Sequence, residues 1–138
     1  MDPIDSLLHD FRTNGAASPD SLDAVERHEA IRLPADYREV MARTDGGEGF
    51  IGTHYLRLWR VAELLPFNRD YVVAQQAPGL LLFGSDGGGE SFAFDTRGGE
   101  MTVVMAPFIV LSLADAIKVA TNFTELLMRM HSGESLFH

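Results

Sequence analysis

The sequence predicts an α+β fold in which helices come first, an antiparallel sheet follows and a last helix closes the chain. Three observations support this order. Apolar residues recur at helical spacing in the first third of the chain and again near its end. Between these regions, short apolar runs are separated by glycine-rich turns, as in antiparallel strands. Neither a repeat nor a linker interrupts the 138 residues, so we expect a single domain over 1–138.

The first third of the chain carries start and stop signals for three helices. Asp2-Pro3 is typical of an N-cap followed by the first helical residue, and Ser18-Pro19 repeats this signal. Leu33-Pro34 begins a third apolar pattern, and Gly46-Gly47 supplies the left-handed conformation that ends a helix. We therefore expect helices over 3–12, from 18 to about 29, and from 33 to about 45.

A hairpin within residues 80–96 is expected to form the middle of the sheet. The apolar run 80–83 is typical of a strand buried on both faces, whereas 91–95 alternates like a half-buried strand. The glycines at 87–89 suit a tight turn, so at least one of them should have a positive φ. A phosphate-binding loop is excluded, because a strand rather than a helix follows these glycines.

The remaining elements are predicted from shorter patterns. Strands are expected at 50–51, 54–61 and 101–105, with an edge segment at 107–111. Pro66 is expected to break the segment between the sheet's first strands and its central hairpin, leaving a short helix near 68–75. The patterns at 112–115 and 122–125 have the spacing of capping boxes. They predict a helical turn over 112–118 and a terminal helix from 122 to about 130.

Composition limits the classes of function. Twenty acidic residues against eleven basic ones give a net charge of −9, which argues against direct binding of nucleic acid. This charge favours a basic partner, although solubility alone is an equally ordinary reason for it. The absence of cysteine excludes disulfides and thiolate zinc sites and fits a cytoplasmic protein. No apolar run is long enough to cross a membrane, and the acidic N-terminus lacks the features of a secretory signal.

Six segments are distinctive when taken together: 33–37, 45–47, 55–59, 83–90, 92–95 and 122–127. In this order, over roughly residues 20–130, they resemble the SUKH superfamily, most closely its cell-wall-assembly-regulator-like branch. The resemblance implies a curved antiparallel β-sheet with N-terminal helices and a C-terminal helix packed against it. It also implies a non-enzymatic role. Bacterial members are mostly immunity proteins that bind and neutralise toxins, often nucleases, and eukaryotic members are interaction modules. One departure is Thr44, because an asparagine next to the glycines is common in the family. This difference affects the capping of the helix.

No pattern of an enzyme, a metal centre or a cofactor site is found in the sequence. The five histidines lack zinc-site spacing, and 84–87 lacks the spacing of a nucleophile elbow. Asp86, Glu90 and Asp95 are candidates for a carboxylate pair or a hard-cation site, but acidic residues in a glycine turn are more often turn formers. Asp95 is expected to cap the turn at 96–97. We therefore expect no catalysis, no metal and no cofactor.

The candidate partner-binding residues come from one strand and two glycine-rich loops. Tyr55, Arg57 and Trp59 alternate on one strand face, and these residue types are enriched at interface hot spots. The alternative is that a helix covers this face and makes the three residues part of the core. Four carboxylates lie in the loops, either as recognition groups or as solubilising charge: Asp45, Glu48, Asp86 and Glu90.

The sequence therefore favours a non-enzymatic protein-binding module in the cytoplasm. The main hypothesis is a bacterial immunity protein that neutralises a basic toxin domain, such as a nuclease, by covering the toxin's nucleic-acid site with an acidic surface. In this hypothesis Trp59 is the first anchor, with Tyr55 and Arg57 beside it, and the loop carboxylates steer association. The alternative is a general interaction module of the SUKH type with no toxin partner.

Overall fold

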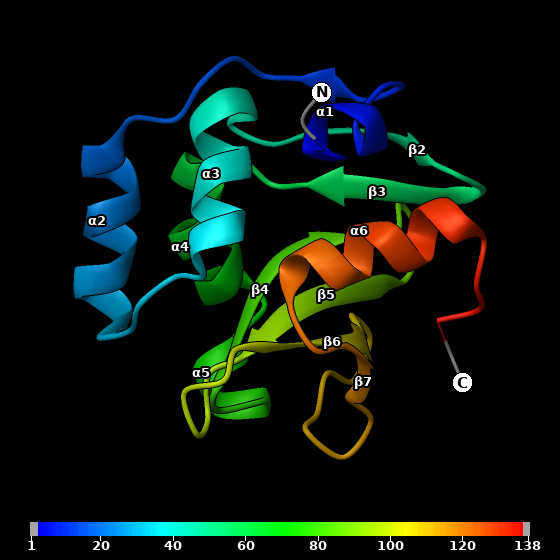
Figure 1. Ribbon diagram of the computed structural model, residues 1–138. Helices are drawn as coiled ribbons and strands as arrows, with labels where there is room; N and C mark the ends of the chain where they lie inside the picture. Colours follow the sequence, from blue (N-terminus) through cyan, green and yellow to red (C-terminus); the bar gives the residue numbers. More distant parts are fainter. Residues whose placement is uncertain (1–2, 137–138) are drawn as a thin grey trace.

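The computed structural model describes residues 3–136, which form an α+β fold of helices packed on an antiparallel sheet (Figure 1). The expected class is confirmed, with N-terminal helices and a C-terminal helix against a curved sheet. The helices are α1 (Pro3–Leu7), α2 (Pro19–Glu29), α3 (Ala35–Thr44), α4 (Val61–Asp70), α5 (Val73–Gln76) and α6 (Phe123–Ser132). The strands are β1 (Arg12–Thr13), β2 (Gly47–Ile51), β3 (His54–Leu58), β4 (Leu80–Ser85), β5 (Glu90–Asp95), β6 (Thr102–Pro107) and β7 (Ile117–Ala120).

The sheet has the simplest antiparallel topology, because each strand pairs with the next strand along the chain. The predicted hairpin, β4–β5, lies in the middle of the seven strands. Its ladder runs from Leu80 opposite Asp95 to Ser85 opposite Ser91. The prediction that one of the tip glycines has a positive φ is confirmed at Gly87, where φ is 84°.

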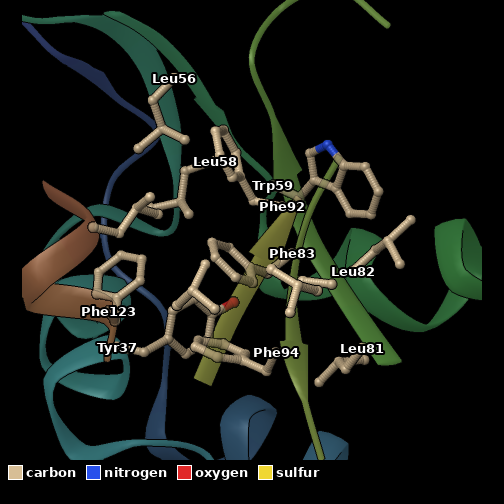
Figure 2. Close-up of a cluster of buried hydrophobic side chains, with 14 of the residues drawn as sticks. Tyr37, Leu56, Leu58, Trp59, Leu81, Leu82, Phe83, Phe92, Phe94 and Phe123 are labelled. Carbon is tan, nitrogen blue, oxygen red and sulfur yellow. The ribbon is translucent and has the colours of Figure 1, made fainter. Parts of the chain in front are cut away.

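The inner face of the sheet carries the aromatic core (Figure 2). Tyr37 of α3 and Phe123 of α6 pack on Phe83 and Phe94 of the central hairpin, with ring centroids 5.1–6.3 Å apart. Phe83 and Phe94 themselves stack at 4.4 Å, and all four side chains are fully buried. This core fixes α3 and α6 on one side of the sheet, which leaves the outer face to α4 and α5.

Helix α4 is attached to the sheet through a buried side-chain amide. Asn68 accepts the N–H of Leu82 at 2.9 Å and donates Nδ2–H to the Leu82 carbonyl, also at 2.9 Å. Strand β3 pairs with β4 only near Ser85, so the amide of Asn68 binds a stretch of β4 backbone that has β5 on one side and no strand on the other. The expected break at Pro66 is wrong, because α4 continues through this residue and is packed against the sheet on both sides of it.

Four other predictions differ from the structure. Strand β5 is buried from Ser91 to Phe94 rather than half-buried. Helices α4 and α5 pack on its neighbour β4. The segment 107–111 is not an edge strand, and 112–118 is not helical: a turn in which Ser112 Oγ accepts the N–H of Asp115 leads into β7. Helix α1 ends at Leu7 instead of 12, and the expected N-cap at Asp2 lies outside the described residues.

The predicted starts of α2 and α6 are confirmed. Ser18 Oγ accepts the N–H of Ser21 at 3.2 Å, and Asn122 Oδ1 accepts the N–H of Glu125 at 2.8 Å. Helix α6 ends at Gly133, which has the left-handed conformation. Within residues 3–136, none of the helices is long and apolar enough to cross a membrane.

Candidate protein-interaction groove

The outer face of the sheet contains a groove of about 1210 Å³ beside α4. Its floor is formed by β2, β3 and the end of β4. Its walls come from β1, from α4, from the glycine tip of the β4–β5 hairpin and from the chain that follows β6. Helix α4 covers the sheet next to this groove but does not extend across β1 and β2, which is why this part of the face remains open.

Trp59 lies at the bottom of the groove and is only 6% exposed. Its ring meets Phe67 of α4 edge-on at 4.9 Å and is stacked with Tyr71 and Phe108, each at 6.3 Å. Tyr71 and Phe108 contact each other at 4.7 Å. Of the two alternatives that the sequence left open, burial under a helix therefore applies to Trp59. The rings of Tyr71 and Phe108 lie nearer to solvent.

Tyr55 and Arg57 form a polar network with Glu48 on the open part of the strand. The Tyr55 hydroxyl donates to Glu48 Oε2 at 2.6 Å, and Arg57 Nε donates to the same oxygen at 3.2 Å. The register explains the contact, because Glu48 and Arg57 are directly opposite in the β2–β3 ladder. The hydroxyl of Tyr55 and then the guanidinium of Arg57 lower the pKa of Glu48, and the hydrogen bond to Glu48 raises the pKa of Tyr55.

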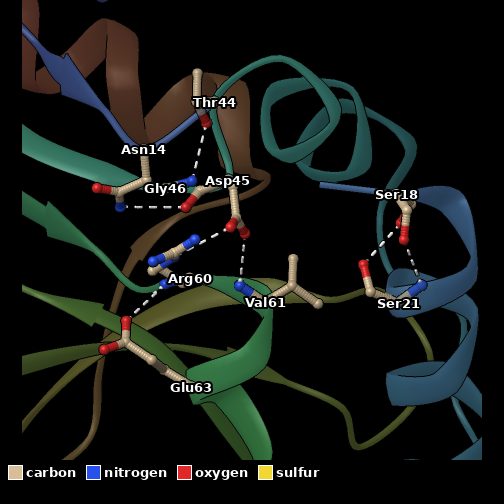
Figure 3. A network of polar contacts seen from close by, with 9 residues as sticks. All are labelled: Asn14, Ser18, Ser21, Thr44, Asp45, Gly46, Arg60, Val61 and Glu63. Atoms are coloured by element: carbon tan, nitrogen blue, oxygen red, sulfur yellow. Dashed lines mark hydrogen bonds and ion pairs between the residues drawn. The ribbon is translucent and has the colours of Figure 1, made fainter. Parts of the chain in front are cut away.

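Asp45 connects the end of α3 to the start of α4 (Figure 3). Its Oδ1 accepts the N–H of Val61 at 3.0 Å, and its Oδ2 pairs with Arg60 Nε at 3.1 Å. Asp45 itself has the left-handed conformation with φ 47°, so the predicted cap begins one residue before the glycines. Gly46 follows with φ 78°, and a Cβ there would lie 2.4 Å from the Leu58 carbonyl oxygen. The side chain of Asp45 is only 13% exposed, so this carboxylate is a structural link.

Thr44 takes part in the same cap. Its hydroxyl donates to the Val40 carbonyl at 2.8 Å and accepts the N–H of Gly46 at 3.0 Å (Figure 3). At this position the threonine hydroxyl therefore binds the backbone at the end of α3.

Asp86 and Glu90 lie on the two sides of the hairpin tip. Asp86 Oδ1 accepts the N–H groups of Gly88 at 2.8 Å and Glu90 at 3.3 Å, so Asp86 is a turn former. Burial and then the neighbouring charge of Asp86 raise the pKa of Glu90. Within the described part of the chain, neither carboxylate forms an ion pair.

The carboxylates considered for catalysis are not brought together. Asp95 lies at the opposite end of β5 from Glu90, where it accepts the N–H of Arg97 at 3.0 Å and pairs with the guanidinium of the same residue. The predicted cap of this turn is confirmed. Among residues 3–136, no group of three or more His, Cys, Asp or Glu side chains is placed to hold a metal ion.

The groove thus joins some of the predicted partner-binding residues and separates others. Glu48, Arg57 and Trp59 line it, and Tyr55 adjoins it through Glu48. Asp45 lies behind Arg60, and Asp86 and Glu90 flank the tip that forms one wall. Sequence reasoning missed most of the other lining residues, among them Tyr71, Phe108 and Ile109. The signal for the last two was the apolar run at 107–111, which was interpreted as a strand.

Comparison with known proteins agrees with the ordered segments found in the sequence. The family model described as SMI1 / KNR4 family (SUKH-1) matches residues 16–129, which is most of the chain. None of the curated proteins matches the chain. The matched region runs from just before α2 into α6 and so includes β2–β7 and α4, the elements that build most of the groove. The chain therefore belongs to the SMI1 / KNR4 family, SUKH-1.

Proposed function

We propose that this protein is a non-enzymatic binding module, and that it acts as an immunity protein by binding and neutralising a basic toxin domain. The observation that carries the proposal is the open groove on the outer sheet face. Its polar side chains, such as Glu48 and Arg57, are already bonded to one another instead of converging on a small ligand. An open surface with an aromatic floor and a polar network between Glu48, Tyr55 and Arg57 is suited to a protein partner. Membership of the SUKH-1 family supports an interaction role of this kind.

Electrostatics support a basic partner. The net charge of −9 attracts a domain that presents Lys and Arg to nucleic acid, and opposite charges raise the association rate. Asp45 and Glu48 are paired with Arg60 and Arg57, so their charges are largely compensated. We therefore assign the steering role to Asp86 and Glu90, and a supporting role in the groove to Asp45, Glu48 and Tyr55.

The test is co-expression with a toxin domain encoded next to this protein, followed by binding kinetics over a salt series. We expect rescue of growth and an association rate that falls as salt rises, because the Debye length shrinks from ~10 Å at 0.1 M to ~3 Å at 1 M. Growth that is not rescued, or the absence of a neighbouring toxin, would leave the general interaction module as the function.

A pair of matched variants separates the mechanism from the role. Asp86→Asn combined with Glu90→Gln keeps the hydrogen-bond acceptors of the hairpin and removes two charges. Asp20→Asn combined with Glu100→Gln removes the same charge from exposed positions outside the groove. We expect only the first pair to slow association, by roughly threefold or more. If both pairs have the same effect, steering comes from net charge alone and the assignment to the hairpin is wrong.

A further inference from the structure

An exposed apolar ridge borders the groove. It consists of Tyr71, Phe108 and Ile109, which line the groove, together with Val72 and Val110, which follow Tyr71 and Ile109 in the chain. Tyr71 and Val72 are 40% and 44% exposed, and Ile109 and Val110 are 82% and 79% exposed. The contact between the Tyr71 and Phe108 rings joins the two segments into one surface, and both rings rest on Trp59. The ridge is thus continuous with the aromatic floor of the groove.

The ridge is not explained by the needs of the fold. Ile109 and Val110 bury little of their surface and so contribute little to the core. Val72 and Val110 both have φ 55°, a left-handed conformation that β-branched residues rarely adopt. Backbone strain therefore accompanies an exposed apolar side chain next to Tyr71 and another next to Ile109, and strain of this kind clusters where proteins bind ligands.

Carboxylates without ion pairs surround the ridge. Asp70 directly precedes Tyr71 and lines the groove. Glu90 lies opposite Pro107 in the β5–β6 ladder, and the N–H of Phe108 donates to the Gly89 carbonyl at 2.9 Å, which places the acidic hairpin tip beside the ridge. Within residues 3–136, no ion pair is formed by any of these three carboxylates: Asp70, Asp86 and Glu90. Arg12, Arg57 and Arg60 also line the groove, and the last two are paired with Glu48 and Asp45. Arg69, the nearest cation in sequence, lines a neighbouring cleft between α2, α4 and α5, which Val72 borders as well.

We propose that this ridge is the anchor of the partner interface, and that the partner presents an apolar side chain surrounded by Lys and Arg. This inference rests on the proposed function, because it places the anchor of the interface beside the same groove. A second copy of this chain is disfavoured as the occupant, since two molecules of charge −9 repel and would bring the same carboxylates face to face. A basic protein with an apolar centre matches both the ridge and its acidic border.

Trp59 allows a direct test, because it is the only tryptophan and lies beneath Tyr71 and Phe108. The probes are two synthetic amphipathic peptides about fourteen residues long, one of leucine and lysine and the other of leucine and glutamate. We expect the Leu/Lys peptide to change Trp59 emission to saturation and the Leu/Glu peptide to leave it unchanged. A Leu/Lys peptide that has no effect, or a Leu/Glu peptide that binds equally well, would overturn the proposal.

Two variants locate the binding. Ile109→Ser combined with Val110→Asn removes the most exposed part of the ridge, and Asn tolerates the left-handed conformation, so the thermal midpoint should not fall. Met128→Ser, at an apolar position of α6 that is 58% exposed and outside the groove, is the matched control. We expect the double variant to weaken binding of the Leu/Lys peptide by at least about tenfold and the control to leave it unchanged. Equal binding by both variants contradicts the proposal.

The same variants distinguish this proposal from the immunity role. If a neighbouring toxin domain binds the wild type and the ridge variant equally, the ridge is not the anchor, although the immunity role stands. If no toxin is neutralised but the Leu/Lys peptide binds at the ridge as expected, the immunity role fails and the anchor stands.

Discussion

The two ends of one strand face, Trp59 and the Tyr55–Arg57 pair, have opposite roles although they belong to one alternating pattern. Trp59 is covered by α4 and by the chain after β6, and is 6% exposed. The side chain of Arg57 is 55% exposed, and its charge is balanced by Glu48 across the ladder. A periodicity of two determines which face a side chain occupies, but a different segment determines whether that face is buried.

The largest effect is expected at the covered end. Trp59→Ala removes a ring that contacts three other aromatic side chains, and should lower the free energy of unfolding by about 3–5 kcal/mol. Urea denaturation followed by far-UV circular dichroism measures this loss. Tyr55→Ala is the matched substitution at the open end and should cost much less. Equal losses would mean that the two ends of the strand face are equally important for stability.

The next effect tests the link that holds α4 over Trp59. Asn68→Ala leaves the buried N–H and C=O of Leu82 without their partners, which should cost about 2–3 kcal/mol. Amide exchange at Leu82 should accelerate, because its N–H loses the only side chain that protects it outside the ladder. Asn14→Ala removes an exposed amide that donates to the Asp45 carbonyl at 3.2 Å, and is the control. A stable Asn68→Ala variant would show that packing alone fixes α4.

The central hairpin and helix α4 show why the candidate site was only partly predictable from the sequence. The central hairpin was predicted correctly, because Gly87 and the apolar run 80–83 encode it locally. Helix α4 was missed, because its start depends on Asp45, which accepts the N–H of Val61 from sixteen positions away in the sequence. Pro66 lies inside this helix, and the burial of Leu64 and Asn68 on either side of it is likewise a non-local feature that the sequence pattern does not show.

The ridge shows the same limit at a shorter range. A run of apolar residues from 107 to 111 is typical of a strand, and nothing local indicates that Ile109 and Val110 remain in solvent. The strand that does follow, β7, begins after the Ser112 turn and has only four residues. Of the four carboxylates expected in loops, Asp86 lies in a turn and Asp45 at the end of α3, whereas Glu48 and Glu90 belong to strands β2 and β5. Only the structure separates the structural link at Asp45 from the unpaired charge at Glu90.

A smaller effect is expected at the border between the two ends, where the hairpin tip meets Tyr55. Gly87→Val imposes a positive φ of 84° on a β-branched residue and places its Cβ 2.8 Å from the Tyr55 ring, so it should cost about 1–2 kcal/mol. Gly89→Val is the control, because no atom lies within 4 Å of its Cβ and its φ is not left-handed. Thermal unfolding of both variants checks the difference, and equal midpoints would contradict the hairpin geometry.

The smallest effects are expected at two carboxylates whose pKa values move in opposite directions. The pKa of Glu48 is lowered from 4.5, chiefly by the Tyr55 hydroxyl, so this contribution to stability is present above pH 4.5 and is lost as the pH falls through the folded-state value. Tyr55→Phe should therefore lower the thermal midpoint at neutral pH, and the difference from wild type should shrink in acid.

Glu90 provides the opposite case, because burial raises its pKa above 4.5 and its ionised form opposes folding. Glu90→Gln should raise the thermal midpoint at neutral pH. This gain should shrink as the pH falls through the raised pKa, and it should be absent below pH 4.5. Midpoints measured from pH 3 to pH 8 for both variants test the pair together. If the two variants shift the midpoint in the same direction, or by amounts independent of pH, then folding does not favour the ionised form of Glu48 and oppose that of Glu90. If the shifts are opposite, Glu90 carries a charge that the fold does not compensate. A carboxylate that pairs with a basic group of the partner requires this property.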